Sequence, residues 1–216
     1  MPGLPLSAIE LEFARRYDQE HARVCQQPRS QSLACRLAFW REEQLVRKAL
    51  KVAGEPGLIL DLACGAGRFW PVLAEHGNRV ILASDPSQEM LDHARTHHPQ
   101  KLLERIRTFQ SSAFTISLPA NAVDCIFCMQ LFQRIDSAEH RLAMLREFHR
   151  VSRDTVIVAA RIKGHFKHRN DVQAPPLAGK AELEAGFRNA GFTLLGHQDF
   201  LPGCAGLRIY VLRKAS

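Results

Sequence analysis

The pattern of hydrophobic and polar positions changes near residue 55 of this 216-residue chain. Before that point apolar side chains recur at helical spacing, which predicts helices over residues 6–24 and 32–53. Pro28 marks the break between the two helices, and Gly54-Glu55-Pro56-Gly57 ends the second. The apolar stripes are Leu6, Ile9, Phe13 and Tyr17 in the first helix, and Leu33, Leu37, Trp40, Leu45 and Leu50 in the second.

After residue 55, short apolar runs typical of buried strands alternate with amphipathic segments. Strands are expected at 58–62, 80–83, 106–109, 123–129, 155–160, 192–195 and 207–212. Helices are expected at 69–75, 87–97, 138–151 and 181–190. Ser87 is a candidate N-cap. In the third of these helices, the side chains expected to face the sheet are Leu142, Leu145, Phe148 and Val151.

Strands that alternate with helices pair in parallel through right-handed crossovers, with helices on both faces of the sheet. We therefore expect an α/β fold with a doubly wound, seven-stranded, mostly parallel sheet. The expected domains are an N-terminal helical arm or lid over residues 1–54 and a ligand-binding domain over residues 55–216. In such sheets ligands bind at the carboxyl ends of the strands, so the loops there carry the candidate chemistry.

The loop after the first strand has the sequence Asp61-Leu62-Ala63-Cys64-Gly65-Ala66-Gly67-Arg68. Glycines between a strand and a helix let the backbone approach a ligand closely. Asp85 ends the second strand, 20 residues after Gly65, where a carboxylate can accept hydrogen bonds from both ribose hydroxyls. The unit therefore predicts a nucleoside-binding site.

Other nucleoside ligands fit this loop poorly. A dinucleotide site would have a third glycine where Trp70 stands, and Asp61 would repel a pyrophosphate. A phosphate-binding P-loop would have Lys and Ser or Thr in place of Arg68-Phe69. An acidic strand end suits S-adenosylmethionine (SAM), which carries a sulfonium and an ammonium group and no phosphate.

At this point the sequence resembles class I (Rossmann-like) SAM-dependent methyltransferases. The segment 61–68 resembles the first motif of that family, and Asp85 its second-strand acid. The resemblance continues through 87–94, 118–127 and 146–151, so it covers residues 55–160 in detail and the whole chain in layout. This sequence departs from the family pattern at Ala63, where a glycine is usual, at Gln110-Ser111-Ser112-Ala113, where an acid often contacts adenine, and at Gln133-Arg134, where His-His is usual.

The resemblance implies SAM as the cofactor and assigns contacts to it. The implied cofactor-binding residues are Tyr17, Asp61, Ala63, Gly65, Gly67, Asp85, Pro86, Met90, Ser112, Ala113, Phe114 and Met129. Some of them have a purely structural alternative: helix packing for Tyr17 and Gly67, and core filling for Met90. Such an alternative is weak for Asp61 and Asp85, because buried carboxylates need partners.

Methyl transfer needs alignment of the reactants, exclusion of water and, for some acceptors, a general base. Candidate catalytic residues near the ends of the fourth and fifth strands are Gln130, Arg161 and His165, with Gln133 and His168 beside them. The histidines could act as general bases near neutral pH, although each is better explained individually as an ordinary loop residue, and Arg161 could bind an anionic acceptor. The segment Cys128-Met129-Gln130-Leu131 lacks the motifs for base-amine or cytosine methylation, which favours a small-molecule or lipid-linked, glycolipid-type acceptor.

Composition and charge leave two alternatives open. The chain is 46% hydrophobic and 24% charged, as in globular proteins, and its net charge is +7. Residues 134–170 carry nine basic and four acidic groups, densest at 161–169, which keeps an RNA methyltransferase in view. A non-catalytic SAM-fold module that binds a protein partner through its basic arm is the other alternative.

The remaining expectations concern the cysteines and the location of the protein. No stretch approaches the ~20 apolar residues of a transmembrane helix, and no signal peptide is recognised at the N-terminus. The six cysteines point to a reducing, cytoplasmic compartment. Cys125-Ile126-Phe127-Cys128 has CxxC spacing, which permits a zinc or redox site, but it also has the pattern of a buried strand; we predict small core residues and no metal site.

Overall fold

The structure is a computed structural model that describes residues 33–135, 137–162, 178–201 and 206–215. The predicted helix over 6–24, Tyr17, His165 and His168 lie outside these ranges. The chain divides into two compact units, residues 1–40 and 41–216. The larger unit contains the sheet and is described here, together with helix α2 (Leu33–Val52), whose second half belongs to it.

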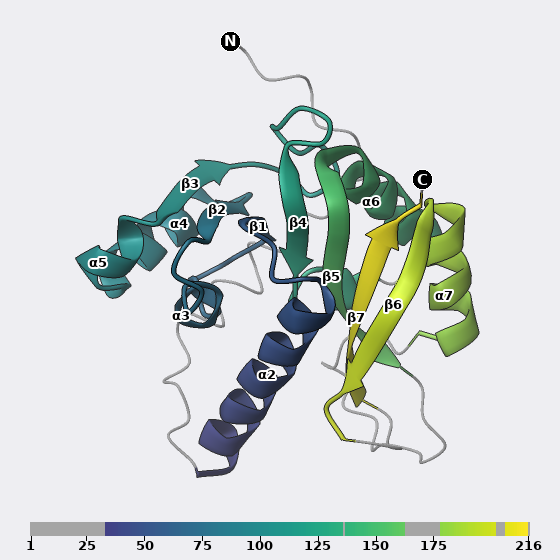
Figure 1. The fold of residues 1–216 in the computed structure, drawn as a ribbon, viewed down its shortest axis with the longest axis horizontal. Helices are drawn as coiled ribbons and strands as arrows, with labels where there is room; N and C mark the ends of the chain where they lie inside the picture. Colours follow the sequence, from purple (N-terminus) through teal and green to yellow (C-terminus); the bar gives the residue numbers. More distant parts are fainter. Residues whose placement is uncertain (1–32, 136, 163–177, 202–205, 216) are drawn as a thin grey trace. The chain divides into compact units, whose positions relative to one another are not determined.

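A seven-stranded mixed sheet organises the larger unit (Figure 1). The strands lie in the order β3-β2-β1-β4-β5-β7-β6, so the chain starts in the middle of the sheet and builds outward on both sides. All pairings from β3 to β5 are parallel, whereas β7 is antiparallel to both of its neighbours. The strands are β1 (Leu58–Leu62), β2 (Val80–Asp85), β3 (Ile106–Gln110), β4 (Val123–Cys128), β5 (Ser152–Ile162), β6 (Phe192–Asp199) and β7 (Gly206–Lys214).

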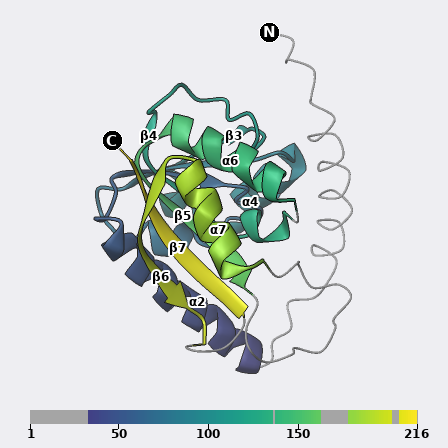
Figure 2. The same ribbon diagram turned by 90° about the vertical axis from the view of Figure 1, so that its right-hand side faces the viewer.

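Helices cover both faces of the sheet (Figure 2). The helices after α2 are α3 (Trp70–Leu73), α4 (Gln88–His97), α5 (Gln100–Leu103), α6 (Ala138–Val151) and α7 (Lys180–Asn189), with a 3₁₀ turn η1 at Phe132–Arg134. One hydrophobic cluster joins α2, α3 and α4 to one face, whereas α6 and α7 pack on the other. The expected doubly wound α/β fold is therefore confirmed.

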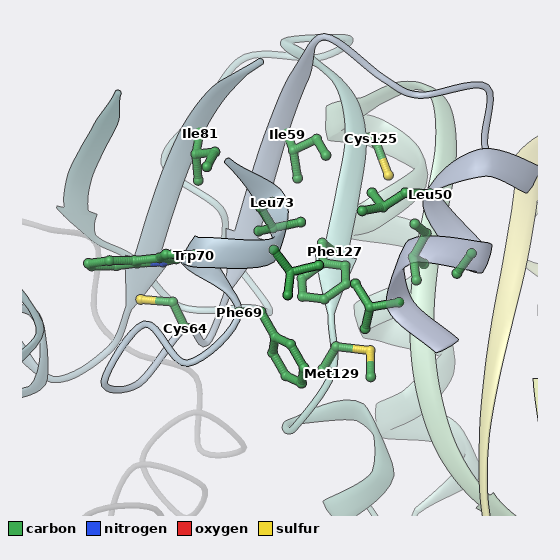
Figure 3. Close-up of a cluster of buried hydrophobic side chains, with 14 of the residues drawn as sticks. Leu50, Ile59, Cys64, Phe69, Trp70, Leu73, Ile81, Cys125, Phe127 and Met129 are labelled. Carbon is green, nitrogen blue, oxygen red and sulfur yellow. The ribbon is translucent and has the colours of Figure 1, made fainter. Parts of the chain in front are cut away.

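The core on the α2 side is built from alternate residues of the central strands (Figure 3). Ile59, Phe127 and Ile157 are fully buried there. Leu50 of α2 and Leu73 of α3 pack against this layer. Because the central parallel strands are covered on both faces, their sequences are apolar throughout rather than alternating.

Two expectations about helix faces were right only in part: Leu45 and Leu50 of α2, and Leu145, Phe148 and Val151 of α6, are buried as predicted. The residues of α2 that are buried are Leu45, Val46, Ala49 and Leu50, whereas Leu33, Leu37 and Trp40 of the predicted stripe are exposed. In α6, Met144 is buried in place of the predicted Leu142, which is half-exposed. In both helices apolar residues occupy more than one face, so periodicity alone does not choose the buried one.

Most predicted boundaries are close to those observed. Ser87 caps α4, as expected: its hydroxyl accepts from the Met90 amide at 3.3 Å. The short segments α5 and η1 were not expected, and β5, β6 and β7 are longer than predicted. The antiparallel strand β7 is the exception within the mostly parallel sheet, since it returns between β5 and β6.

Candidate active site

The loop between β1 and α3 bends through three residues with left-handed backbone. Ala63, Gly65 and Gly67 have φ values of 57°, 54° and 71°. Glycine adopts such values freely, whereas Ala63 does so at a cost in conformational energy. The Cys64 amide donates to the Ser84 carbonyl at 3.0 Å, which fastens the loop to the end of β2. The loop therefore lies at the carboxyl ends of two adjacent parallel strands.

Gly67 is required by close packing as well as by its φ. A Cβ atom at this position would lie 2.5 Å from Cδ2 of Trp70, closer than real contacts allow. Trp70 is fully buried in the core, and its backbone amide donates to the Gly67 carbonyl at 3.0 Å. The indole therefore occupies the space that a third glycine leaves open in dinucleotide-binding folds.

Asp85 joins the ends of β1 and β2. Its Oδ2 accepts from the Gly65 amide at 2.9 Å, and its Oδ1 accepts from the Ser87 amide at 3.0 Å. The side chain is fully buried. A carboxylate fixed through backbone donors has remaining lone pairs with a defined direction, as needed to accept from ribose hydroxyls.

Asp61 is a buried carboxyl group, 3% exposed, without an ion-pair partner among the described residues. Its pKa is raised from 3.8 to about 7, mainly by burial; the Trp70 indole opposes the shift, and the negative charge of Asp85 contributes to it. The ionised form of this carboxyl group has no balancing positive charge among the described residues, so a nearby cation would stabilise it. It fits a ligand that brings a positive charge, such as the ammonium or sulfonium of SAM.

Two hydrogen bonds order the end of β3 and the segment after it, where several of the residues expected around adenine lie. Gln110 donates from Nε2 to the Pro86 carbonyl at 2.7 Å and so ties the end of β3 to the turn after β2. The Ser112 hydroxyl accepts from the Phe114 amide at 3.1 Å. Ala113 and Met90 are buried, and Phe114 is half-buried.

The candidate catalytic residues lie where β4 and β5 end. Met129 is buried in the core on the α2 side, near Phe69 (Figure 3), and Gln130 after it is half-exposed. Arg161 is half-buried near the end of β5, and its carbonyl accepts from the Ala178 amide at 3.0 Å. Gln130 and Arg161 thus share the carboxyl edge with the loop after β1. His165 remains a prediction.

Two contacts to the loop after β1 were not expected from the sequence. Nε2 of His98 hydrogen-bonds to the Ala66 carbonyl at 2.9 Å, and its ring lies 4.9 Å from the Trp70 ring. Arg68 pairs with Glu42 of α2. Both contacts join positions more than 25 residues apart, so no local pattern signals them.

The CxxC pair is part of the core. Cys125 and Cys128 are fully buried in β4, and burial raises the pKa of each thiol to about 12. Thiols that stay protonated are poor nucleophiles and poor metal ligands. Over the described ranges no cluster of three metal-ligating side chains occurs, and no helix there is long and apolar enough to cross a membrane.

Comparison with known proteins agrees with this geometry. The family model described as a methyltransferase domain matches residues 59–155, whereas no curated protein matches the sequence. Residues 59–155 contain the loop after β1, Asp85 and the end of β4.

Several solved structures share the fold at low sequence identity. Magnesium protoporphyrin IX methyltransferase from Synechocystis PCC 6803, crystallised with S-adenosylhomocysteine (SAH), has a TM-score of 0.70 at 16% identity, over 94% of this chain and 97% of that one. A SAM-dependent methyltransferase from Aquifex aeolicus has a TM-score of 0.62 at 23% identity, over 80% and 92% of the two chains. The [4+2]-cyclase SpnF has a TM-score of 0.69 at 17% identity, over 80% of each chain.

Fold, family domain and site geometry agree on the cofactor and the class of enzyme. The domain match extends from the middle of β1 into β5, and the structural likeness extends over most of the chain. Residues 59–155 are identified as a methyltransferase domain, and the chain has the fold of the class I SAM-dependent methyltransferases.

Proposed function

We propose that this enzyme transfers the methyl group of SAM to a small-molecule or glycolipid-type acceptor. The observation that carries the proposal is the Asp85 carboxylate, held by the Gly65 and Ser87 amides beside a left-handed glycine loop. Phosphate ligands are disfavoured there, because Asp61 and Asp85 both place carboxyl groups next to the loop.

The proposed cofactor contacts follow the strand ends. Asp85 accepts from the ribose hydroxyls, and Asp61 balances the cationic part of the cofactor. The loop through Ala63, Gly65 and Gly67 contacts its methionine and ribose portions. Adenine lies among Pro86, Met90, Ser112, Ala113 and Phe114, with Met129 below the transferred group. Tyr17 is proposed as a further contact to the cofactor.

When bound, SAM supplies a methyl group activated by the positive sulfur. The tasks of this chain are to align the acceptor, to exclude water and to take up a proton where the acceptor carries one. We assign Gln130 to orient the acceptor by hydrogen bonding, Arg161 to hold an anionic group and His165 to accept a proton. The arm over residues 1–54 is proposed to cover the acceptor and to select it. The proposed location of the enzyme is the cytoplasm.

One comparison favours a second candidate, a module that works with a protein partner. A putative methyltransferase in complex with the Haloferax volcanii Trm112 methyltransferase activator shares the fold, with a TM-score of 0.63 at 14% identity over 83% of this chain and 94% of that one. Under this alternative, SAM binding or turnover would require a second protein.

Calorimetric titration with SAM and SAH, with ATP and NAD as controls, tests the proposal. We expect binding of SAM and SAH in preference to ATP and NAD, and loss of that binding in Asp85→Ala. Tighter binding of ATP or NAD would contradict the proposal. A folded protein that binds none of the four would favour the partner-dependent alternative. Steeply salt-dependent binding of bulk RNA would point to an RNA acceptor instead.

A further inference from the structure

Two buried hydrogen-bond donors lie close together on β7. Nη1 of Arg208 and the hydroxyl of Tyr210 are shut off from solvent, and among the described residues neither has an acceptor within hydrogen-bond distance. The two side chains interact electrostatically with each other. The Arg208 side chain is 10% exposed, and Tyr210 is fully buried. Two residues apart on one strand, they project to the same face of the sheet. The guanidinium carbon lies 5.7 Å from the centre of the Tyr210 ring.

The surroundings hold these two donors in place without satisfying them. Asp199 of β6 accepts from Nε of Arg208 at 2.5 Å and from Nη2 at 2.9 Å, which leaves Nη1 as the free end of the guanidinium. Phe187 of α7 packs edge-on against the Tyr210 ring at 5.1 Å. Burial raises the pKa of Tyr210 and the neighbouring Arg208 guanidinium opposes this; the net shift is upward, so the hydroxyl remains a donor at neutral pH. Because Asp199 balances the Arg208 charge, the free donors lie in a nearly neutral setting.

Strand register puts the two donors on the edge of the sheet that carries the active site. Arg208 pairs with Ala160 of β5, and Tyr210 pairs with Val158, which pairs in turn with Cys128 at the end of β4. Neighbouring strands are about 4.8 Å apart, so Tyr210 lies about 10 Å across the sheet from β4. The donors therefore lie on the same edge of the sheet as the end of β4, about 10 Å from it.

We propose that Arg208 and Tyr210 form a subsite that binds a carbonyl or carboxylate oxygen of the methyl acceptor. The inference rests on the proposed function, because it places the reacting atom at the end of β4. One such oxygen has two lone pairs and accepts from both donors, which removes the penalty of leaving them buried and unpaired. Anchoring about 10 Å from the reacting atom selects extended acceptors over very small ones.

The test uses the full chain and the fact that it has two tyrosines, Tyr17 and Tyr210. Incorporation of fluorotyrosine gives two fluorine NMR signals, which Tyr17→Phe assigns. The SAH-loaded protein is titrated with phenylbutanoate, phenylbutanamide and phenylbutylamine, three probes of similar length that differ in the polar end. We expect a saturable shift of the Tyr210 signal with at least one of the two oxygen-bearing probes and none with the amine. Whichever of the carboxylate and amide probes binds more tightly shows whether the subsite prefers a charged or a neutral oxygen.

Variants on β7 supply the control. Arg208→Met should weaken binding of the active probe at least about tenfold, as expected for loss of a hydrogen bond to a charged group. Arg213→Met, which removes an exposed arginine of the same strand, should leave it unchanged. If Arg208→Met does not fold, Tyr210→Phe removes only the hydroxyl, and probe-observed NMR measures the same weakening.

Each other outcome overturns the subsite. These outcomes are no Tyr210 shift with either oxygen-bearing probe, an equal shift with the amine, or unchanged affinity in the folded variants. The proposed function fails separately, through absence of SAH binding in the same samples before any probe is added.

Discussion

The Gly65 amide donates to the Asp85 carboxylate at 2.9 Å, so the loop after β1 and the end of β2 form one rigid unit. This hydrogen bond connects positions 20 residues apart and fixes the side chain of Asp85 at the end of β2. The same carboxylate anchors the turn into α4 through the Ser87 amide. One side chain therefore shapes the loop and supplies the acid that we assign to the ribose.

Asp85→Asn should weaken SAM binding about ten- to a hundredfold, because the amide keeps the shape of the side chain but loses the charge that strengthens its hydrogen bonds. Calorimetric titration measures the effect. Asp92→Asn is the matched control, since Asp92 is an exposed acid on α4 that accepts from Gln88 at 2.9 Å. Equal affinities in the two variants would remove Asp85 from the cofactor site.

Gly67→Ala should destabilise the fold by about 1–3 kcal/mol, because alanine at a φ of 71° is strained and its Cβ would lie 2.5 Å from Trp70. Urea unfolding measures the loss. Gly77→Ala is the control: a Cβ there would meet no atom within 4 Å, so the change should be within about 0.5 kcal/mol. A Gly67→Ala protein as stable as the wild type would show that the loop has room to move.

The parts of the fold that follow from local pattern could be predicted, and those that depend on partners distant in sequence could not. The run Leu58–Leu62 is apolar at nearly every position because β1 is covered on both faces, and that pattern is visible in the sequence. The Ser87 cap is equally local. The buried face of α2 is not, because Ala49 becomes a core residue only where the helix comes close to the sheet.

The same distinction applies to the site. The glycine loop and Asp85 are consecutive features of one strand-loop-helix-strand unit, so their spacing identifies them. The contact of His98 with Ala66 and the placement of Arg208 near Asp199 depend on how separate elements meet. Arg208 and Tyr210 have no motif around them, and only the antiparallel register of β7 brings them to the carboxyl edge.

His98 is expected to act as a positioning residue for the loop after β1. His98→Phe keeps a ring beside Trp70 but removes the hydrogen bond to the Ala66 carbonyl, which is 2.9 Å long. We expect SAM affinity to fall about three- to tenfold, in line with the loss of one hydrogen bond. Titration is followed by tryptophan fluorescence in a Trp40→Phe background, in which Trp70 is the one remaining tryptophan. The His98→Phe change should also alter this fluorescence before SAM is added.

Two further variants separate positioning from general destabilisation. His98→Gln can restore a donor to the carbonyl and should recover part of the affinity. His76→Phe changes an exposed histidine and should have no effect. If His98→Phe and His76→Phe bind SAM equally well, His98 has no role in holding the loop.

The buried carboxyl group of Asp61 predicts how cofactor affinity depends on pH. Its pKa is raised from 3.8 to about 7, so the folded protein holds this proton more tightly than the unfolded chain does. In the free protein, the protonated Asp61 side chain therefore favours the folded state. This contribution to stability is lost as the pH rises from about 4 to about 7, because ionisation of the buried group opposes folding. A cationic ligand reverses the preference, because it stabilises the ionised form.

SAM affinity should accordingly rise between about pH 6 and pH 8 and fall by up to about tenfold per pH unit below the pKa of Asp61. Asp61→Asn should bind SAM more weakly at pH 8 and show a flatter profile, since the group that titrates is gone. Without ligand, the stability of Asp61→Asn should no longer fall between about pH 4 and pH 7. Thermal unfolding measures this. A profile equally steep in Asp61→Asn would assign the titration to another group and separate Asp61 from the cationic part of the cofactor.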